Sequence, residues 1–220
     1  MPPTGDWRNA IIYLEAQVKK YGVNLMMGQT ATASMVLGMN PDAVIVATGS
    51  TAVKEDIPGA NKPHVLTLDE AILKGPDELE DEVVIIGAKK WGPEIALWLA
   101  GEEKDVTLID ETAGLAGANM MDTERMLDLP IMLREANVKL FMGAKISSID
   151  DNGVKFADAD GNEQFAAAGT VICAVKRKTN RDLYNELYGK VPELYDVGDC
   201  RRPLYVFYAI HGAAHIARKI

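Results

Sequence analysis

The chain has 220 residues, enough for one large domain or two small domains with a hydrophobic core. Its formal net charge of −9 argues against a nucleic-acid partner and against binding to an anionic membrane surface. No apolar run has the length of a membrane-spanning helix, and the first residues do not have the pattern of a signal peptide. Cys173 and Cys200 form no disulfide framework, so we expect a reducing, cytoplasmic location.

The first quarter of the chain is predicted to contain one helix and two strands. Asp6 is a suitable N-cap for a helix that extends to about Lys20, because apolar residues recur on one face of this segment. Residues 23–27 are predicted to form a short strand. Residues 42–47 are predicted to form a buried strand, and this strand ends in Thr48-Gly49-Ser50.

The centre of the chain has the order strand, glycine turn, helix, strand and acid. The apolar run 83–86 predicts a strand that is buried on both faces, and residues 95–100 predict a helix packed on the sheet. A second strand, 106–109, ends on Asp110. This order is typical of a dinucleotide-binding βαβ unit, in which the turn and the helix N-terminus face a pyrophosphate and the acid accepts hydrogen bonds from a ribose.

The glycine turn departs from the usual G-x-G-x-x-G fingerprint at its middle glycine. It consists of Gly87, Ala88, Lys89, Lys90, Trp91 and Gly92. A side chain at position 89 should crowd the phosphates, although a lysine there could instead supply positive charge to them. The other interpretation is that the unit is scaffold only and binds no nucleotide. Trp91 could stack on a base or cover the edge of an interface.

The second half of the chain predicts a helix over 123–135, which Pro130 would end or kink. A short helix is also expected earlier, near residues 68–73. Antiparallel strands are expected around a turn at 151–153. The predicted strands are 138–143, 144–149, 154–157, 162–165, 169–175 and 194–200, and a final helix covers 204–218.

The histidines and cysteines give only weak signals for a metal site. His211 and His215 lie four residues apart on the last predicted helix, a spacing that two ligands could share. No third ligand is evident, and the sequence contains no C-x-x-C pair. We therefore predict no metal site, and we expect Cys200 to be a core residue.

Four stretches together resemble the flavin- and pyridine-nucleotide-binding half of a flavoprotein family that includes 2,4-dienoyl-CoA reductase, trimethylamine dehydrogenase and related NADH:flavin oxidoreductases. They are residues 41–50, 57–59, 87–94 and 191–200, in that order along the chain. The segment 198–203, followed by 209–212, resembles this subfamily more specifically. The resemblance covers essentially the whole chain.

The resemblance implies an α/β, Rossmann-like fold with two dinucleotide-binding domains. Residues 1–55 and 176–220 would form a discontinuous and incomplete FAD-type domain. Residues 56–175 would form an inserted NAD(P)-binding-type domain. The first FAD-binding βαβ unit and the N-terminal barrel of the family are not found in this sequence.

The resemblance also assigns cofactor positions. Thr48, Gly49, Gly198 and Asp199 would lie near FAD. NAD(H) would bind at the turn 87–92, with Glu94 beside it and Asp110 on the adenosine ribose, where an acid disfavours NADP. Lys176 and Thr179 stand where the family has glycine and proline.

The function implied is an NADH-dependent flavoprotein reductase module. It would pass electrons to a flavin that is completed by another polypeptide, either a partner subunit or an N-terminal region. We accordingly expect the isolated chain to bind FAD poorly. The alternative is a non-catalytic assembly subunit whose degenerate nucleotide site is empty or holds ADP.

Overall fold

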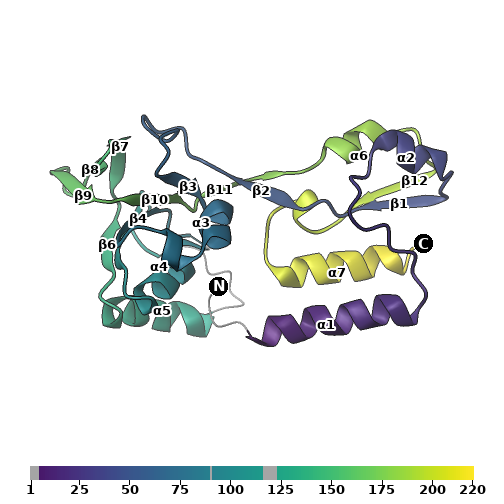
Figure 1. The fold of residues 1–220 in the computed structure, drawn as a ribbon, viewed down its shortest axis with the longest axis horizontal. Coiled ribbons are helices and arrows are strands. Elements are labelled where there is room, and N and C mark those ends of the chain that lie inside the picture. The colour runs from purple at the N-terminus through teal and green to yellow at the C-terminus, as the bar shows by residue number, and fades with distance from the viewer. Residues whose placement is uncertain (1–4, 90, 116–122) are drawn as a thin grey trace. The chain divides into compact units, whose positions relative to one another are not determined.

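The computed structural model describes residues 5–89, 91–115 and 123–220 (Figure 1). The described residues fall into two compact units. Unit 1 is Ala52–Lys176, and unit 2 consists of residues 5–51 and Arg177–Ile220. The domains expected from the sequence change at residues 55/56 and 175/176, whereas the units change at 51/52 and 176/177.

Unit 1 is built on a five-stranded sheet in which every neighbouring pair is parallel. The central strand is β4 (Glu82–Ile86). On one side of it lie β5 (Asp105–Asp110) and then β6 (Lys139–Met142). On the other side lie β10 (Thr170–Cys173) and then β3 (Val65–Thr67). Strands β4, β5, β6 and β10 confirm predicted strands, whereas β3 was not predicted.

The alternation of side chains along β4 gives the sheet a core on each face. Val83 and Ile85 join one apolar cluster, together with residues of α3 (Leu68–Lys74), α4 (Gly92–Gly101) and α5 (Thr123–Glu135). Val84 and Ile86 join a second cluster on the opposite face.

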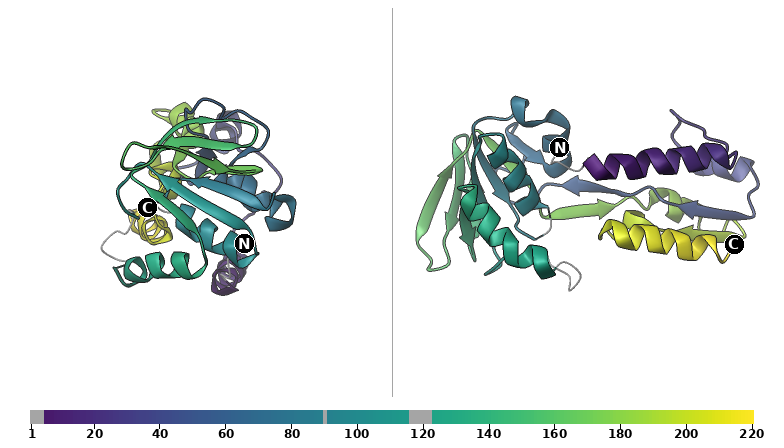
Figure 2. Two further views of the ribbon diagram at one scale, coloured as in Figure 1. Left: turned by 90° about the vertical axis from the view of Figure 1, so that its left-hand side faces the viewer. Right: turned by 90° about the horizontal axis from the view of Figure 1, so that it is seen from below.

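An antiparallel sheet supplies much of that second cluster. It consists of β7 (Lys145–Ile149), β8 (Gly153–Ala157) and β9 (Glu163–Ala167). Figure 2 shows this small sheet on the side of the parallel sheet away from α4 and α5. Both the strands and the turn between β7 and β8 agree with the prediction.

The predicted helix over 123–135 is confirmed, and of the two effects expected of Pro130, an end or a kink, the end does not occur. The helix continues through this residue to Glu135. Pro130 is exposed, so the carbonyl that loses its helical partner there can turn toward water instead.

Unit 2 contains a two-stranded parallel sheet of β1 (Ala43–Val46) and β12 (Glu193–Asp196). Its helices are α1 (Gly5–Lys20), α2 (Ala33–Gly38), α6 (Asp182–Leu187) and α7 (Val206–Ala217). Among the described residues of this unit, one small buried cluster is formed by Val46, Leu187 and Cys200.

The predicted strand at 23–27 is wrong. These residues are irregular, and Val23, Leu25, Met26 and Met27 are exposed. The segment has neither a pairing strand nor a buried face, and an apolar run without them does not hold an extended conformation.

The strands β2 (Ser50–Val53) and β11 (Lys176–Thr179) were not predicted, and they pair as a separate two-stranded sheet. The segment between α3 and β4 contains a short 3₁₀ helix, η1 (Pro76–Glu78). A second one, η2 (Gly198–Cys200), follows β12. None of the described helices combines the length and the apolar character needed to cross a bilayer.

Candidate functional site

The carboxyl ends of β4, β5 and β10 meet at one edge of the parallel sheet in unit 1. Open α/β sheets bind their ligands at this edge, at the point where the strand order reverses. A cavity of about 340 Å³ opens there. Its charged lining residues are Glu55, Asp56, Lys89, Asp110, Glu111 and Lys176.

Two glycines shape the turn that borders this cavity. Gly87 has φ +108°, and a Cβ on it would lie 2.5 Å from Cγ2 of Val175. A Cβ on Gly92 would lie 1.7 Å from the carbonyl oxygen of Gly87. Both positions therefore require glycine, as expected for the first and last glycines of a dinucleotide-binding turn.

Helix α4 begins directly after this turn. Trp91 is the N-cap residue, and its side chain makes no capping hydrogen bond. Pro93 and Glu94 lie in the first turn, and Glu94 is half-buried. The positive end of the helix dipole thus lies at the glycine turn. Trp91 is partly buried and packs against the apolar cluster shared with α4.

Both carboxylate oxygens of Asp110 accept hydrogen bonds that order the turn. The residue is 5% exposed, and its Oδ2 accepts a hydrogen bond of 2.6 Å from the backbone N–H of Ala88. Its Oδ1 accepts hydrogen bonds from the backbone N–H of Thr112, at 2.7 Å, and from the Thr112 hydroxyl. The neighbouring Glu111 is exposed and lines the same cavity, and sequence reasoning gave this residue no role.

Lys89, at the position of the missing middle glycine, is exposed and lines the cavity. Lys90, also predicted to contribute to the site, lies outside the described residues.

The opposite wall is a loop that carries Glu55 and Asp56. This loop is fixed to the β7–β8 hairpin, since Ile149 N donates a 2.8 Å hydrogen bond to the Pro58 carbonyl. A Cβ on Gly59 would lie 2.0 Å from the carbonyl oxygen of Ile149, so the contact requires glycine here. The wall is therefore held in place from outside the βαβ unit.

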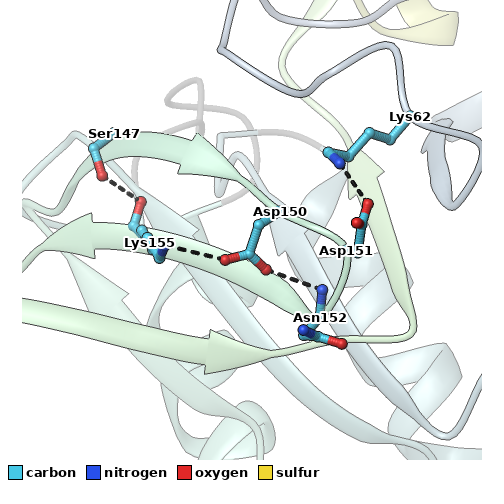
Figure 3. A network of polar contacts seen from close by, with 6 residues as sticks. All are labelled: Lys62, Ser147, Asp150, Asp151, Asn152 and Lys155. Atoms are coloured by element: carbon cyan, nitrogen blue, oxygen red, sulfur yellow. Dashed lines mark hydrogen bonds and ion pairs between the residues drawn. The ribbon is translucent and has the colours of Figure 1, made fainter.

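Charged groups of the hairpin turn reinforce this attachment (Figure 3). Lys62, in the loop, forms an ion pair with Asp151. Asp150 accepts a 2.9 Å hydrogen bond from Asn152 N and lies 3.2 Å from Lys155 Nζ. These hydrogen bonds lower the pKa of Asp150, with the bond from Asn152 as the largest cause.

In unit 2, Asn180 fixes the residues after β1. Its backbone N–H donates to the carbonyl of Gly49 at 3.0 Å, and its side-chain amide donates to the carbonyl of Thr48 at 3.1 Å. The Thr48 hydroxyl donates in turn to the Asn180 carbonyl at 2.5 Å. Gly49 has φ +72°, a conformation that favours glycine.

The structure brings Gly198 and Asp199 to this same part of unit 2. The hydroxyl of Ser50 donates to Oδ2 of Asp199 at 3.0 Å, and Nε of Arg177 donates to that hydroxyl at 2.8 Å. Oδ1 of Asp199 accepts a bond of 3.3 Å from Leu204 N. The two predicted flavin-side segments therefore adjoin, and Ser50 and Arg177 are partners that sequence reasoning did not identify.

A second cavity, of about 230 Å³, lies beside Asp199 and α7. Its polar and aromatic lining includes Arg201, Arg202, Tyr205 and His215. His211 instead stacks on Phe207, with ring centroids 4.0 Å apart. Within the described part of the chain, no three His, Cys, Asp or Glu residues are grouped so that they could hold a metal ion.

Comparison with known proteins supports both the fold and the cofactor class. The pattern of the family described as pyridine nucleotide-disulphide oxidoreductase matches residues 29–215. Cinnamate reductase of Clostridium sporogenes is 27% identical over 98% of this chain. Bilirubin reductase of Mediterraneibacter gnavus is 30% identical over 90% of the chain.

A solved 2-naphthoyl-CoA reductase structure superposes on 96% of the chain with a TM-score of 0.83 and 27% identity. The chain spans about a third of the length of these proteins, namely 32%, 30% and 32%. The Rossmann-like flavoprotein fold expected from the sequence is thereby confirmed.

Proposed function

Because the chain belongs to the pyridine nucleotide-disulphide oxidoreductase family, we propose that it is an NADH-dependent flavoprotein reductase module. It passes electrons to a flavin whose site is completed by another polypeptide segment. The observation that carries this proposal is the cavity at the carboxyl edge of the parallel sheet, bordered by the turn that Gly87 and Gly92 close. Family membership supports pyridine nucleotide and flavin as the cofactors.

The residues around this cavity fit a dinucleotide. The backbone of the turn and the N-terminus of α4 would hold the pyrophosphate. Glu111, which is exposed in the cavity, and Asp110, which orders the turn, would serve the adenosine ribose. Acids at this position repel the 2′-phosphate of NADPH, so the module uses NADH. When bound, NADH supplies the hydride, and the protein contributes orientation and electrostatics.

The residues of unit 2 fit one side of a flavin site. Asp199 would accept hydrogen bonds from the ribityl or pyrophosphate region of FAD, and Thr48-Gly49 would lie beside it. Ser50 and Leu204 N hold the Asp199 carboxylate in place for this task. Another segment would have to supply the remaining FAD-binding βαβ unit, which is in keeping with the partial coverage of the relatives.

We place the chain more specifically with reductases of the 2,4-dienoyl-CoA reductase and trimethylamine dehydrogenase type. The segments 198–203 and 209–212 support this placement. So does the match to cinnamate reductase and to 2-naphthoyl-CoA reductase over nearly the whole chain.

A second candidate function is that of a non-catalytic assembly subunit. Lysines occupy positions 89 and 176, where the related proteins were expected to have glycine, and both line the cavity. Such a site would be empty or would hold ADP. The two functions differ in their ligands, because a reductase binds NADH at least as well as ADP, whereas the assembly subunit binds ADP alone or neither.

Substitutions at Lys89 test whether this cavity is a working nucleotide site. If the side chain crowds the phosphates, Lys89→Gly tightens NADH binding by roughly tenfold, about 1.4 kcal/mol. Lys89→Met is the matched control, since it keeps the length of the side chain and removes only its charge. It should not tighten binding. The measurement is the dissociation constant of NADH from fluorescence titration.

An unchanged dissociation constant in Lys89→Gly would contradict a functional cleft at this turn. Weaker binding in both variants would mean instead that the lysine charge contacts the phosphates, and the crowding argument would then be wrong.

A further inference from the structure

An ion pair closes part of the nucleotide cavity in unit 1. Nζ of Lys176 lies 2.6 Å from Oε2 of Glu55 and donates a hydrogen bond to it. The carboxylate is the more buried partner, with a side chain that is 13% exposed against 59% for the lysine. The other oxygen of Glu55, Oε1, is buried and has no hydrogen-bond partner among the residues that the structure describes.

Lys176 lies where its side chain could contact the phosphates of a bound dinucleotide. The residue follows Val175, whose side chain lies against the position where a Cβ on Gly87 would stand. Since β10 and β4 are adjacent and parallel, the start of β11 lies at the crevice between their carboxyl ends. This crevice is where dinucleotide phosphates bind in folds of this class.

The charge around the cavity is unfavourable for such a ligand. Among the residues that the structure describes, its lining contains the four carboxylates Glu55, Asp56, Asp110 and Glu111 and the two lysines 89 and 176. The hydrogen bond and the charge of Glu55 raise the pKa of Lys176, and Asp56 and Glu111 add to the shift. The ammonium is thus charged but is already neutralised by a carboxylate of the protein.

We propose that Glu55 competes with the phosphates of a bound dinucleotide for the ammonium of Lys176, and so lowers the affinity of the cavity. The inference rests on the proposed nucleotide site. Binding moves the lysine from the carboxylate to the pyrophosphate, and Glu55 is left without its counter-ion. The hairpin contacts of Pro58 and Lys62 keep the Glu55 loop from moving away with the lysine.

The test is a double-mutant cycle on the full chain, with NADH and ADP as separate probes. Glu55→Gln keeps the shape of the side chain and removes its charge. It should tighten the binding of both probes by roughly tenfold, because Lys176 no longer has to leave a carboxylate before it can contact the phosphates, and an ion pair is worth at least that at the dielectric of a protein surface. Lys176→Met should weaken the binding of NADH and of ADP. The double variant with Glu55→Gln should recover little of the lost affinity.

Asp56→Asn is the matched control, because it removes one negative charge from the same cavity without releasing Lys176. Asp56→Asn should increase the affinity for the nucleotides less than Glu55→Gln does, and this increase should persist when Lys176→Met is also present. Thermal unfolding of each variant shows whether the fold is retained. Binding of NADH to the parent chain with no gain in Glu55→Gln would overturn the inference and leave the proposed function standing.

A gain in Glu55→Gln that is equally large without Lys176 would also overturn it, since the effect would then be one of general charge. If neither the parent chain nor Glu55→Gln binds either probe, the proposed nucleotide site itself fails, and the inference fails with it. Binding that appears only in Glu55→Gln would support both.

Discussion

Position 92, in the glycine turn, accommodates only glycine. A methyl group there would overlap the carbonyl oxygen of Gly87, at 1.7 Å, and backbone atoms cannot move aside cheaply. We expect Gly92→Ala to lower the free energy of unfolding by about 1–3 kcal/mol, the usual cost of overpacking. Denaturant-induced unfolding of the variant and the parent chain measures this difference in the free energy of unfolding.

The control for this substitution lies at the other end of the same helix. A Cβ on Gly101 would meet no atom within 4 Å. Gly101→Ala should therefore leave stability unchanged or slightly increased. Equal losses in the two variants would show that the turn is not closed in the way the structure describes.

Asp110 and Glu111 are neighbours with different expected roles. Asp110→Asn leaves the N–H of Ala88 or Thr112 without a carboxylate acceptor, at a cost of about 1–3 kcal/mol in the free energy of unfolding. Glu111→Gln leaves the fold intact, because Glu111 is exposed, but weakens NADH binding. Unfolding and titration experiments on the two variants measure this contrast. The prediction is contradicted if Glu111→Gln lowers the free energy of unfolding, or if Asp110→Asn does not lower it.

The turn between β8 and β9 is an element whose stability depends on pH. Asp158 accepts hydrogen bonds from the backbone N–H groups of Asn162, at 2.9 Å, and Asp160, at 3.0 Å. These bonds, that of Asn162 foremost, lower the pKa of Asp158 from its ordinary value of 3.8. The carboxylate thus stabilises the turn above that pH, and the contribution is lost as the pH falls through the lowered pKa.

We therefore expect carboxyl NMR titration to give Asp158 a pKa below 3.8. The same protein with Asp158→Asn should lose less stability on acidification than the parent chain. Asp160→Asn is the neighbouring control and should behave like the parent. A normal pKa at Asp158 would mean that the turn is not held by these bonds.

The elements that the sequence predicted are those whose cause lies within a short stretch. Val83–Ile86 and the glycine spacing after it require a buried strand and a tight turn wherever the rest of the chain lies. The strand Lys176–Thr179 was missed, because its Lys-Arg-Lys-Thr sequence has no apolar period and its pairing with β2 depends on distant residues.

The same distinction applies to the candidate site. Gly87, Gly92 and Asp110 were predicted from spacing alone, and the structure brings them together. Glu55 could not be predicted, because its position depends on Pro58 and Lys62 contacting a hairpin about 90 residues further along. The sequence around Glu55 does not indicate a contact with residues so far along the chain.

At the scale of the whole molecule, unit 2 exposes much apolar surface. The sheet of β1 and β12 has two strands, and several apolar residues of α1 and α7 are exposed, including Ile11 at 65% and Ile210 at 55%. A half-covered domain of this kind gives a flavin few contacts. We therefore expect the purified chain to carry far less than one FAD per molecule, as measured by absorbance of the released flavin. A stoichiometric yellow chromophore would contradict this expectation.

The central claim is that the edge of the parallel sheet in unit 1 binds NADH. Calorimetric titration of the full chain with NADH, with ADP and NADPH as controls, tests it most directly. The account predicts a dissociation constant in the micromolar range, corresponding to roughly −8 kcal/mol, and weaker binding of NADPH. Absence of heat with all three nucleotides would contradict the account, and binding of ADP without NADH would favour the assembly subunit.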